Sequence, residues 1–161
     1  MRPSLCDDVP PTRPIPEQEV FLNVLRTADL LGRGLEELLK PSGLSPTQYN
    51  ALRIIRGAGD AGIPCGHIGD RMITRDPDIT RLLDRLAKRR LITRRRQADD
   101  RRVVKAFIAP DGQALLKSLD KPVLDLHRSQ LAALGDKKLA TLALLLVEAS
   151  SSLASALEAE R

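Results

Sequence analysis

The stretch DPDITRLLDRLAKRRLITRRRQADDRRVVKAFI, which runs from Asp76 to Ile108, contains the pattern that decides the fold. Its first residues predict the start of a helix, because acidic residues and proline are favoured in a first helical turn. The apolar positions that follow are spaced by three, one and three residues, which places Ile79, Leu82, Leu83 and Leu86 on one inward face. The outer face carries Asp78, Arg81, Arg85 and Lys88.

A shorter helix is expected just before this one, from about Pro64 to Met72, with Ile68 and Met72 facing inward. Two short helices joined by a tight turn, the second with basic residues outward, are typical of a helix-turn-helix. The second helix would then be the recognition helix, which enters the major groove of duplex DNA.

A β-hairpin is expected after the recognition helix. Its strands are predicted at 91–96 and 102–108, with a turn at 97–101. The second strand alternates, so that Val103, Lys105 and Phe107 face one side and their neighbours the other. A helix-turn-helix followed by a hairpin predicts a mainly α fold with a small β-hairpin wing (α+β), a winged helix-turn-helix.

The positive charge of the chain is concentrated in this segment. The 161 residues carry a net charge of +5. Residues 71–105 hold 13 Lys/Arg and 5 Asp/Glu, whereas the remainder holds 13 and 16. One basic segment on a neutral-to-acidic body is typical of a polyanion-binding protein, although a solvated charged helix face is the alternative. Aromatic residues make up only 2% of the chain, which disfavours a platform for stacking single-stranded bases.

Helices are also expected on both sides of the winged segment. Pro16 starts a long one, and Pro41 and Gly43 end it. Ser45 and Gln48 have the spacing of a capping box, which predicts a helix start after Ser45. Two more helices are expected near 113–134 and from Gly135 onward. Apolar stripes run along the first and last helices at Val24, Ala28, Leu31, Leu35 and Leu38, and at Leu139, Leu142, Leu146, Ala149 and Leu153. A second copy of the chain is the simplest cover for these stripes.

Several other classes of protein are disfavoured. No apolar run is expected to span a bilayer, and no signal peptide is expected. The two cysteines, Cys6 and Cys65, are too few for a disulfide framework, so a reducing cytoplasm is the default. His67 and His127 stand apart from other metal ligands, so no metal and no cofactor is expected. Catalytic motifs are not found, so the chain is not expected to be an enzyme.

Three segments together resemble one known family. LSPTQYNALRIIR, DPDITRLLDRLAKRRLITRRR and DDRRVVKAFIAPDGQALL are similar to the MarR/SlyA family of bacterial winged-helix regulators. Five prolines among the first sixteen residues predict a flexible proline-rich arm (1–16), and the resemblance makes the rest of the chain one MarR-like domain (17–161). Within that domain, it implies dimerisation helices at 17–40 and 113–161 and a DNA-binding lobe at 45–109. It also implies a homodimer that represses transcription from a palindromic operator and is released by a small ligand or an oxidant.

The sequence departs from the family pattern at two positions. Arg90 stands after the recognition helix where the family usually has glycine, so this helix end is expected to have a different shape. Ala109 replaces the threonine that usually precedes the next helix, and Asp111 is expected to take over its capping role.

The recognition helix and the residues before it supply the first set of predicted DNA contacts. Arg81 is expected to read guanine through its O6 and N7 atoms, with a phosphate contact or an internal salt bridge as the alternative. Pro77 and Asp78 are expected near base edges, where Asp78 either accepts a bond from cytosine or favours the helix dipole. Thr74 and Arg75 are expected at phosphates. Arg85 completes this set on the outer face of the helix.

The wing supplies the second set. Arg101 is expected to enter a minor groove, and Arg102 to brace the wing through Asp99 or Asp100, although the two arginines could exchange roles. The remaining wing arginines are candidates for phosphate contacts: Arg94, Arg95 and Arg96.

Two alternatives to ligand-controlled DNA binding remain open from the sequence. Cys65 or Cys6 could sense oxidants, because a thiolate at Cys65 would be favoured by the start of its helix. The basic face could instead bind a protein partner. Salt-dependent binding to duplex DNA would separate that interaction module from a DNA-binding regulator.

Overall fold

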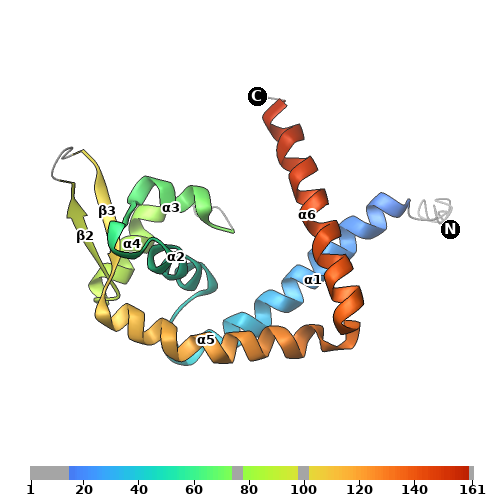
Figure 1. The fold of residues 1–161 in the computed structure, drawn as a ribbon, viewed down its shortest axis with the longest axis horizontal. Helices are drawn as coiled ribbons and strands as arrows, with labels where there is room; N and C mark the ends of the chain where they lie inside the picture. The colour runs from blue at the N-terminus through green and yellow to red at the C-terminus, as the bar shows by residue number, and fades with distance from the viewer. Residues whose placement is uncertain (1–14, 74–77, 98–101, 160–161) are drawn as a thin grey trace, which may run out of the picture.

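The computed structural model describes residues 15–73, 78–97 and 102–159. The helices are α1 (Pro16–Leu39), α2 (Pro46–Gly57), α3 (Cys65–Arg71), α4 (Ile79–Lys88), α5 (Pro110–Leu131) and α6 (Gly135–Ala159). The strands are β1 (Ile63–Pro64), β2 (Ile92–Arg96) and β3 (Val104–Ile108), and short 3-10 turns occupy Lys40–Ser42, Gly59–Ala61 and Ala132–Leu134. Figure 1 shows a winged lobe of α2, α3, α4 and the strands, from which α5 runs to a helical region where α1 and α6 lie.

The expected helix-turn-helix and hairpin are confirmed, with one addition to the sheet. β2 and β3 pair antiparallel in the register Ile92↔Ile108 and Arg96↔Val104. A third strand, β1, pairs with β3 through Ile63↔Ala106, so the strand order is β1-β3-β2. The sequence did not indicate β1, because two residues are too few for a visible alternation. Pro64 is compatible with this place because β1 is an edge strand.

The start of α2 follows the predicted capping box. Ser45 Oγ accepts the backbone N–H of Gln48, and Gln48 Oε1 accepts the backbone N–H of Ser45, each at 3.1 Å. Pro46 occupies the first helical position, where its missing N–H leaves no bond unmade. Gly43 ends the preceding turn with φ 63°, a conformation that glycine adopts without strain.

The start of α5 differs from the expectation. The helix begins at Pro110 and not near Gln113, and its N-cap is Ala109, which makes no side-chain capping bond. Asp111 therefore does not cap the helix, and the expectation that it would was wrong. It lies in the first turn, where its charge is favourable next to the positive end of the helix dipole. Helix formation here needs no cap, because Pro110 at the first position and the packing of Gly112 against Leu91 already fix the chain.

The end of the recognition helix α4 also differs from the expectation. Arg90 has φ 58°, so it adopts the left-handed conformation that glycine favours at this position. Leu91 N donates to Leu86 O at 3.0 Å, and Arg90 N donates to Ala87 O at 2.9 Å. These two bonds form a Schellman cap, and its two leucines are buried together in the core. Arginine therefore keeps the shape that was expected to change, at a strain of about 1 kcal/mol.

The hydrophobic core lies in the winged lobe. The largest fully buried side chains are Leu39, Leu52, Ile55, Ile68, Leu83, Leu86 and Leu116. α1 contributes only Leu39 to the buried set, and the described part of α6 contributes none. Large apolar side chains of these two helices are instead exposed, among them Phe21, Leu30, Leu144 and Leu153.

The exposed leucines of α6 bear on the expectation that no apolar run is long enough to span a bilayer. The helical stretch Pro110–Ala159 contains a long apolar segment, none of which is buried. By length and composition alone, this stretch is able to cross a membrane, so the expectation that no apolar run is long enough was wrong. Glu148 and the serines that follow it interrupt the leucines of α6, so the sequence contains no unbroken apolar run of this length.

Candidate nucleic-acid interface

The recognition helix α4 separates an apolar face from a basic one. Leu82, Leu83 and Leu86 are buried, whereas Arg81 and Arg85 are exposed on the opposite side. The helix starts at the N-cap Asp78, whose carboxylate accepts the backbone N–H of Arg81 at 3.1 Å. The buried leucines fix the rotation of α4, so the exposed arginines point away from the core.

Arg81 and Asp78 also form an ion pair. Arg81 Nε lies 2.9 Å from Asp78 Oδ2, and the Arg81 side chain is 77% exposed. The structure therefore contains the internal salt bridge that was the alternative for Arg81, and the base contact stays a prediction. In the free protein, the salt bridge forms through Nε.

The wing is joined to α4 by an ion pair that the sequence did not indicate. Arg94 of β2 donates from Nη2 to Asp84 Oδ1 of α4, and both side chains are partly shielded from solvent. This contact fixes the side of the hairpin against the recognition helix. Bracing of the wing was predicted for Asp99 and Asp100, and the structure adds Asp84 as a brace from a different element.

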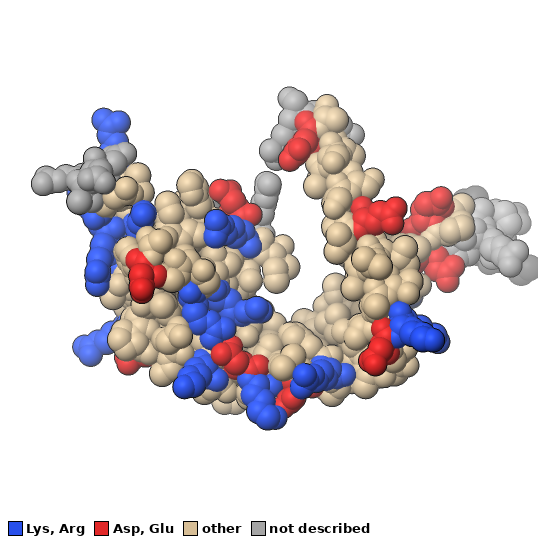
Figure 2. All heavy atoms as spheres, viewed as in Figure 1, with Lys and Arg blue, Asp and Glu red and all other residues tan. Residues whose placement is uncertain are grey.

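The other wing arginines lie at the surface. Arg95 places its guanidinium 5.3 Å from the centre of the Phe107 ring, which is a cation–π contact across the two strands. Arg96 and Arg102 are exposed. Figure 2 shows Lys and Arg side chains gathered over the hairpin side of the lobe. Several of the predicted contact residues lie outside the described residues: Thr74, Arg75, Pro77, Asp99, Asp100 and Arg101.

Arg89 has a structural role that sequence reasoning missed. Its Nη1 and Nη2 donate to the backbone carbonyls of Gly43 and Ser42, each at 2.7 Å. These bonds tie the end of α4 to the linker between α1 and α2. Arg89 is separated from its partners by more than forty residues, so spacing along the sequence could not reveal the contact.

A polar hollow lies between the start of α2 and α4. Its volume is about 240 Å³, and it is lined by Ser45, Thr47, Gln48, Asp78, Leu82 and Arg85. Hydroxyl groups, a helix N-terminus and an arginine are the groups that proteins use to hold phosphate oxygens. This hollow joins the outer face of α4 to the start of α2.

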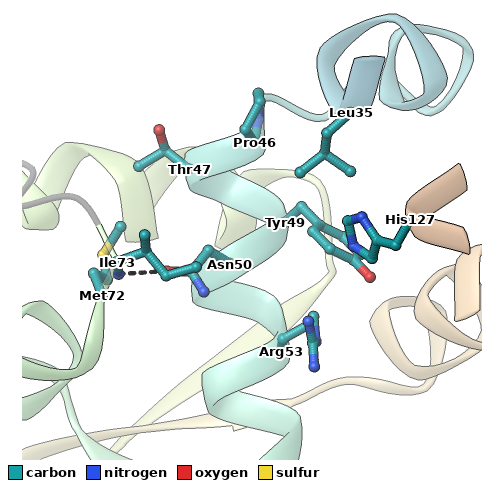
Figure 3. A pocket seen from close by; sticks show the side chains of 9 residues that line it. All are labelled: Leu35, Pro46, Thr47, Tyr49, Asn50, Arg53, Met72, Ile73 and His127. Carbon is teal, nitrogen blue, oxygen red and sulfur yellow. Dashed lines mark hydrogen bonds between the residues drawn. The ribbon is translucent and has the colours of Figure 1, made fainter. Parts of the chain in front are cut away.

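A second hollow lies between the winged lobe and the helices that leave it (Figure 3). Its volume is about 240 Å³, and its lining combines apolar, aromatic and cationic side chains: Leu35, Pro46, Thr47, Tyr49, Asn50, Arg53, Met72, Ile73 and His127. Tyr49, Arg53 and His127 also line an adjoining hollow of about 250 Å³ next to Arg56 and Asp120. Burial raises the pKa of the Tyr49 hydroxyl, which stays protonated at neutral pH. This site could not be predicted from the sequence, because its residues come from α1, α2, α5 and the segment after α3.

An ion pair closes one side of this region. Arg56 of α2 donates from Nη1 and Nη2 to the two carboxylate oxygens of Asp120 of α5, at 2.9 and 2.8 Å. The hydrogen bonds from Arg56 lower the pKa of the Asp120 carboxyl, and the same bonds raise the pKa of the Arg56 guanidinium. The winged lobe is thereby fastened to α5 by a bidentate contact.

Cys65 does not have the environment that an oxidant sensor was expected to have. Burial raises the pKa of its thiol, and this effect exceeds the opposing influence of Arg94. The expectation that the helix start favours the thiolate was therefore wrong, because loss of solvent outweighs the favourable charges. Cys6 lies outside the described residues. Within those residues, neither His67 nor His127 belongs to a group of three potential metal ligands.

Comparison with known proteins decides the family. A model of the MarR family matches residues 42–103, which run from the first linker through the helix-turn-helix and β2 and end just before β3. The crystal structure of a MarR transcription factor from Planctomyces limnophilus is 38% identical, with a TM-score of 0.65, over 83% of this chain and 96% of that one. The chain belongs to the MarR family.

Other MarR structures relate the fold to DNA. A mutant E. coli MarR in complex with operator DNA is 26% identical, with a TM-score of 0.74, over 81% of this chain and 93% of that one. BpsR of Bordetella bronchiseptica, whose DNA binding is regulated by 6-hydroxynicotinic acid, shares the fold with a TM-score of 0.76. That match has 19% identity and covers 85% and 96% of the two chains. This MarR-family protein is thus a DNA-binding transcription regulator with a winged helix, and not an enzyme.

Proposed function

We propose that this protein is a cytoplasmic homodimeric repressor that binds an inverted-repeat operator with α4 and the wing. The observation that supports this most is the outer face of α4, where Arg81, Arg85 and Lys88 are exposed beside a hairpin of arginines. α4 is held to the lobe by buried leucines, and the hairpin is held to α4 by Arg94. A rigid basic helix beside a basic hairpin fits a major groove and its flanking backbone.

The individual arginines take different roles in this proposal. Arg81 reads a guanine, because its guanidinium lies outward near the start of the recognition helix. Arg94 positions the wing through Asp84 and is a weaker candidate for a phosphate contact than the sequence suggested. Arg95 and Arg96 contact phosphates. The roles of Arg101 and Arg102 in the minor groove, and of Thr74, Arg75 and Pro77 at the helix start, stay predictions.

The dimer is proposed to form through α1 and α6. Leu144, Leu145, Leu146 and Val147 are consecutive and exposed, so this turn of α6 is apolar all around, as a helix segment at the centre of an assembly is. A hollow of about 360 Å³ between α1 and α6 is lined almost entirely by apolar side chains, which a second copy would fill. Deleting residues 135–161 should leave an aggregating or unfolded chain, because obligate dimers often lack a stable monomer. A soluble, folded monomer from this truncation would contradict the proposal.

The hollow beside Tyr49 and Arg53 is the proposed effector site. Apolar walls, two rings and one arginine suit a small aromatic acid, and such sites combine apolar surface with a few polar groups. Asn50 Oδ1 accepts the backbone N–H of Ile73 at 3.1 Å, so the hollow borders the segment that leads into the recognition helix. Small aromatic carboxylates should release the protein from DNA, and Arg53→Ala should abolish this response. Release that persists in the variant would contradict the assignment.

Selection of bound duplexes from random DNA, followed by footprinting, tests the proposed function. Two recognition helices related by a two-fold axis should protect inverted half-sites about 10 base pairs apart on one face of the duplex. Tight binding of a monomer to one asymmetric half-site would contradict the proposed dimer.

Alanine variants test the roles on the selected operator and on scrambled DNA. Arg81→Ala should reduce the free energy of operator binding by about 1–3 kcal/mol and relax specificity at one base. Arg95→Ala should weaken binding to both duplexes equally. It should also lower the slope of log affinity against log salt concentration by about one unit. Arg101→Ala should lose the most affinity for operators with A·T-rich flanks. If the variant loses no affinity for either DNA, the wing tip does not contact DNA.

A further inference from the structure

The N-cap of the recognition helix contacts the same arginine twice. Asp78 Oδ1 accepts the backbone N–H of Arg81 at 3.1 Å, and Asp78 Oδ2 lies 2.9 Å from Arg81 Nε. One carboxylate thus holds both the main chain and the side chain of the residue that is proposed to read a base. The backbone bond is an ordinary N-cap, whereas the side-chain bond has a different consequence.

The side-chain bond determines which edge of the guanidinium faces outward. The Asp78 contact uses Nε, and within residues 15–73, 78–97 and 102–159 no further contact of Arg81 is found at Nη1 or Nη2. These two nitrogens carry the N–H groups that form a planar fork. A fork of this kind matches the O6 and N7 atoms of guanine in the major groove.

We propose that Asp78 is a positioning residue that determines the base specificity of Arg81. It holds Nε so that the Nη fork is presented to guanine before DNA arrives. This inference rests on the proposed function, in which Arg81 reads a base. Holding a long side chain in its binding geometry lowers the entropy lost on binding and excludes other rotamers that could reach other bases.

Electrostatics supports a role beyond capping. Asparagine and serine cap helices about as well as aspartate does, so capping does not require a charged residue here. A carboxylate on the DNA-facing side of the protein is repelled by phosphates, which lowers affinity for any sequence. Asp78 is one of only a few acidic residues in the basic segment 71–105, and its carboxylate forms an ion pair with Arg81 at Nε. This ion pair acts on the orientation of Arg81, so that specificity is gained while general affinity is reduced.

The test measures base discrimination, using the full-length protein and its selected operator. The contacted guanine is first located as the base at which Arg81→Ala loses discrimination. Asp78→Ser and Asp78→Asn keep a capping oxygen and remove the ion pair, and Asp136→Ser removes an equal charge from the first turn of α6 as a matched control. Affinities are measured on duplexes with each of the four base pairs at that position. The ratio of two affinities from one preparation is independent of its folded fraction.

Both Asp78 variants should lose about three- to tenfold in discrimination at this base pair, while affinity for scrambled DNA rises or stays equal. Asp136→Ser should keep the discrimination of the parent protein. In the Arg81→Ala background, Asp78→Ser should change nothing further at this base. Parental discrimination in both Asp78 variants would show that Asp78 is only a cap, and a loss that persists without Arg81 would show that Asp78 contacts the base itself. Either result overturns the inference and leaves the proposed function intact. Equal losses for Arg81→Ala on operator and scrambled DNA would overturn both.

Discussion

Gly112 lies at a contact that joins the start of α5 to the end of the recognition helix. A Cβ added at Gly112 would lie 2.1 Å from the carbonyl oxygen of Leu91 and 2.9 Å from Ile108 Cδ1. That carbonyl accepts the backbone N–H of Ala109 at 3.0 Å, and Leu91 N donates to Leu86 at the end of α4. The clashing atom therefore belongs to a backbone that is bonded on both sides and cannot rotate away.

We expect Gly112→Ala to lower the free energy of unfolding by about 2 kcal/mol. Overpacking a close contact costs about 1–3 kcal/mol, and a backbone clash of this depth falls at the upper end. Replacing glycine by alanine in a helix returns at most about 1 kcal/mol of that loss. At 2–4 °C per kcal/mol for a chain of this size, the melting temperature should fall by about 4–8 °C.

Thermal and urea denaturation at one fixed protein concentration measure the effect, because dimer stability depends on concentration. Gly69→Ala is the matched control: it lies within α3, and a Cβ there meets nothing within 4 Å. The control should be neutral or more stable by up to about 1 kcal/mol. A Gly112→Ala protein as stable as the parent would show that α5 does not pack on Leu91 as described.

Three further predictions concern Arg90, the α2–α5 ion pair and Cys65. Arg90→Gly should raise the free energy of unfolding by about 1 kcal/mol, because glycine relieves the strain at φ 58°, and a loss of stability would contradict the cap geometry. Arg56→Gln should lower the free energy of unfolding by about 0.5–1 kcal/mol at pH 7. Folding lowers the pKa of Asp120, so the stabilisation by this ion pair is present above about pH 4 and is lost as the pH falls further. If the parent protein and the variant differ in stability as much at pH 2 as at pH 7, the prediction is refuted. Iodoacetamide should alkylate Cys65 slowly at pH 7 in a Cys6→Ser background, since burial raises its pKa, whereas rapid alkylation at pH 7 would contradict a protonated thiol.

Features that depend on neighbouring residues could be predicted from the sequence. The capping box at Ser45 and Gln48, the left-handed Gly43 and the apolar face of α4 each involve residues within one or two helical turns. Their physics is local, so spacing and residue type are sufficient. The start of α2 and the orientation of α4 follow from these signals.

Contacts between distant elements could not be predicted in this way. The Arg94–Asp84 brace, the Arg89 bonds to the first linker and strand β1 form only when the lobe has assembled. At Arg90, a local preference is overruled by packing. The free-energy cost of positive φ for arginine is smaller than the stabilisation from the two Schellman bonds and the buried leucine contact. Single-residue preferences decide a conformation only where packing does not.

The salt dependence of DNA binding shows whether α4 and the wing bind duplex DNA and read its sequence. The affinity of the parent protein should be measured on the selected operator and on a scrambled duplex of equal length, at several salt concentrations between about 50 and 200 mM. The logarithm of affinity should fall steeply and linearly with the logarithm of salt concentration on both duplexes, and the operator should be preferred by at least about a thousandfold. Equal affinity for the two duplexes, or binding that salt does not weaken, would contradict a regulator that reads DNA with α4 and its wing.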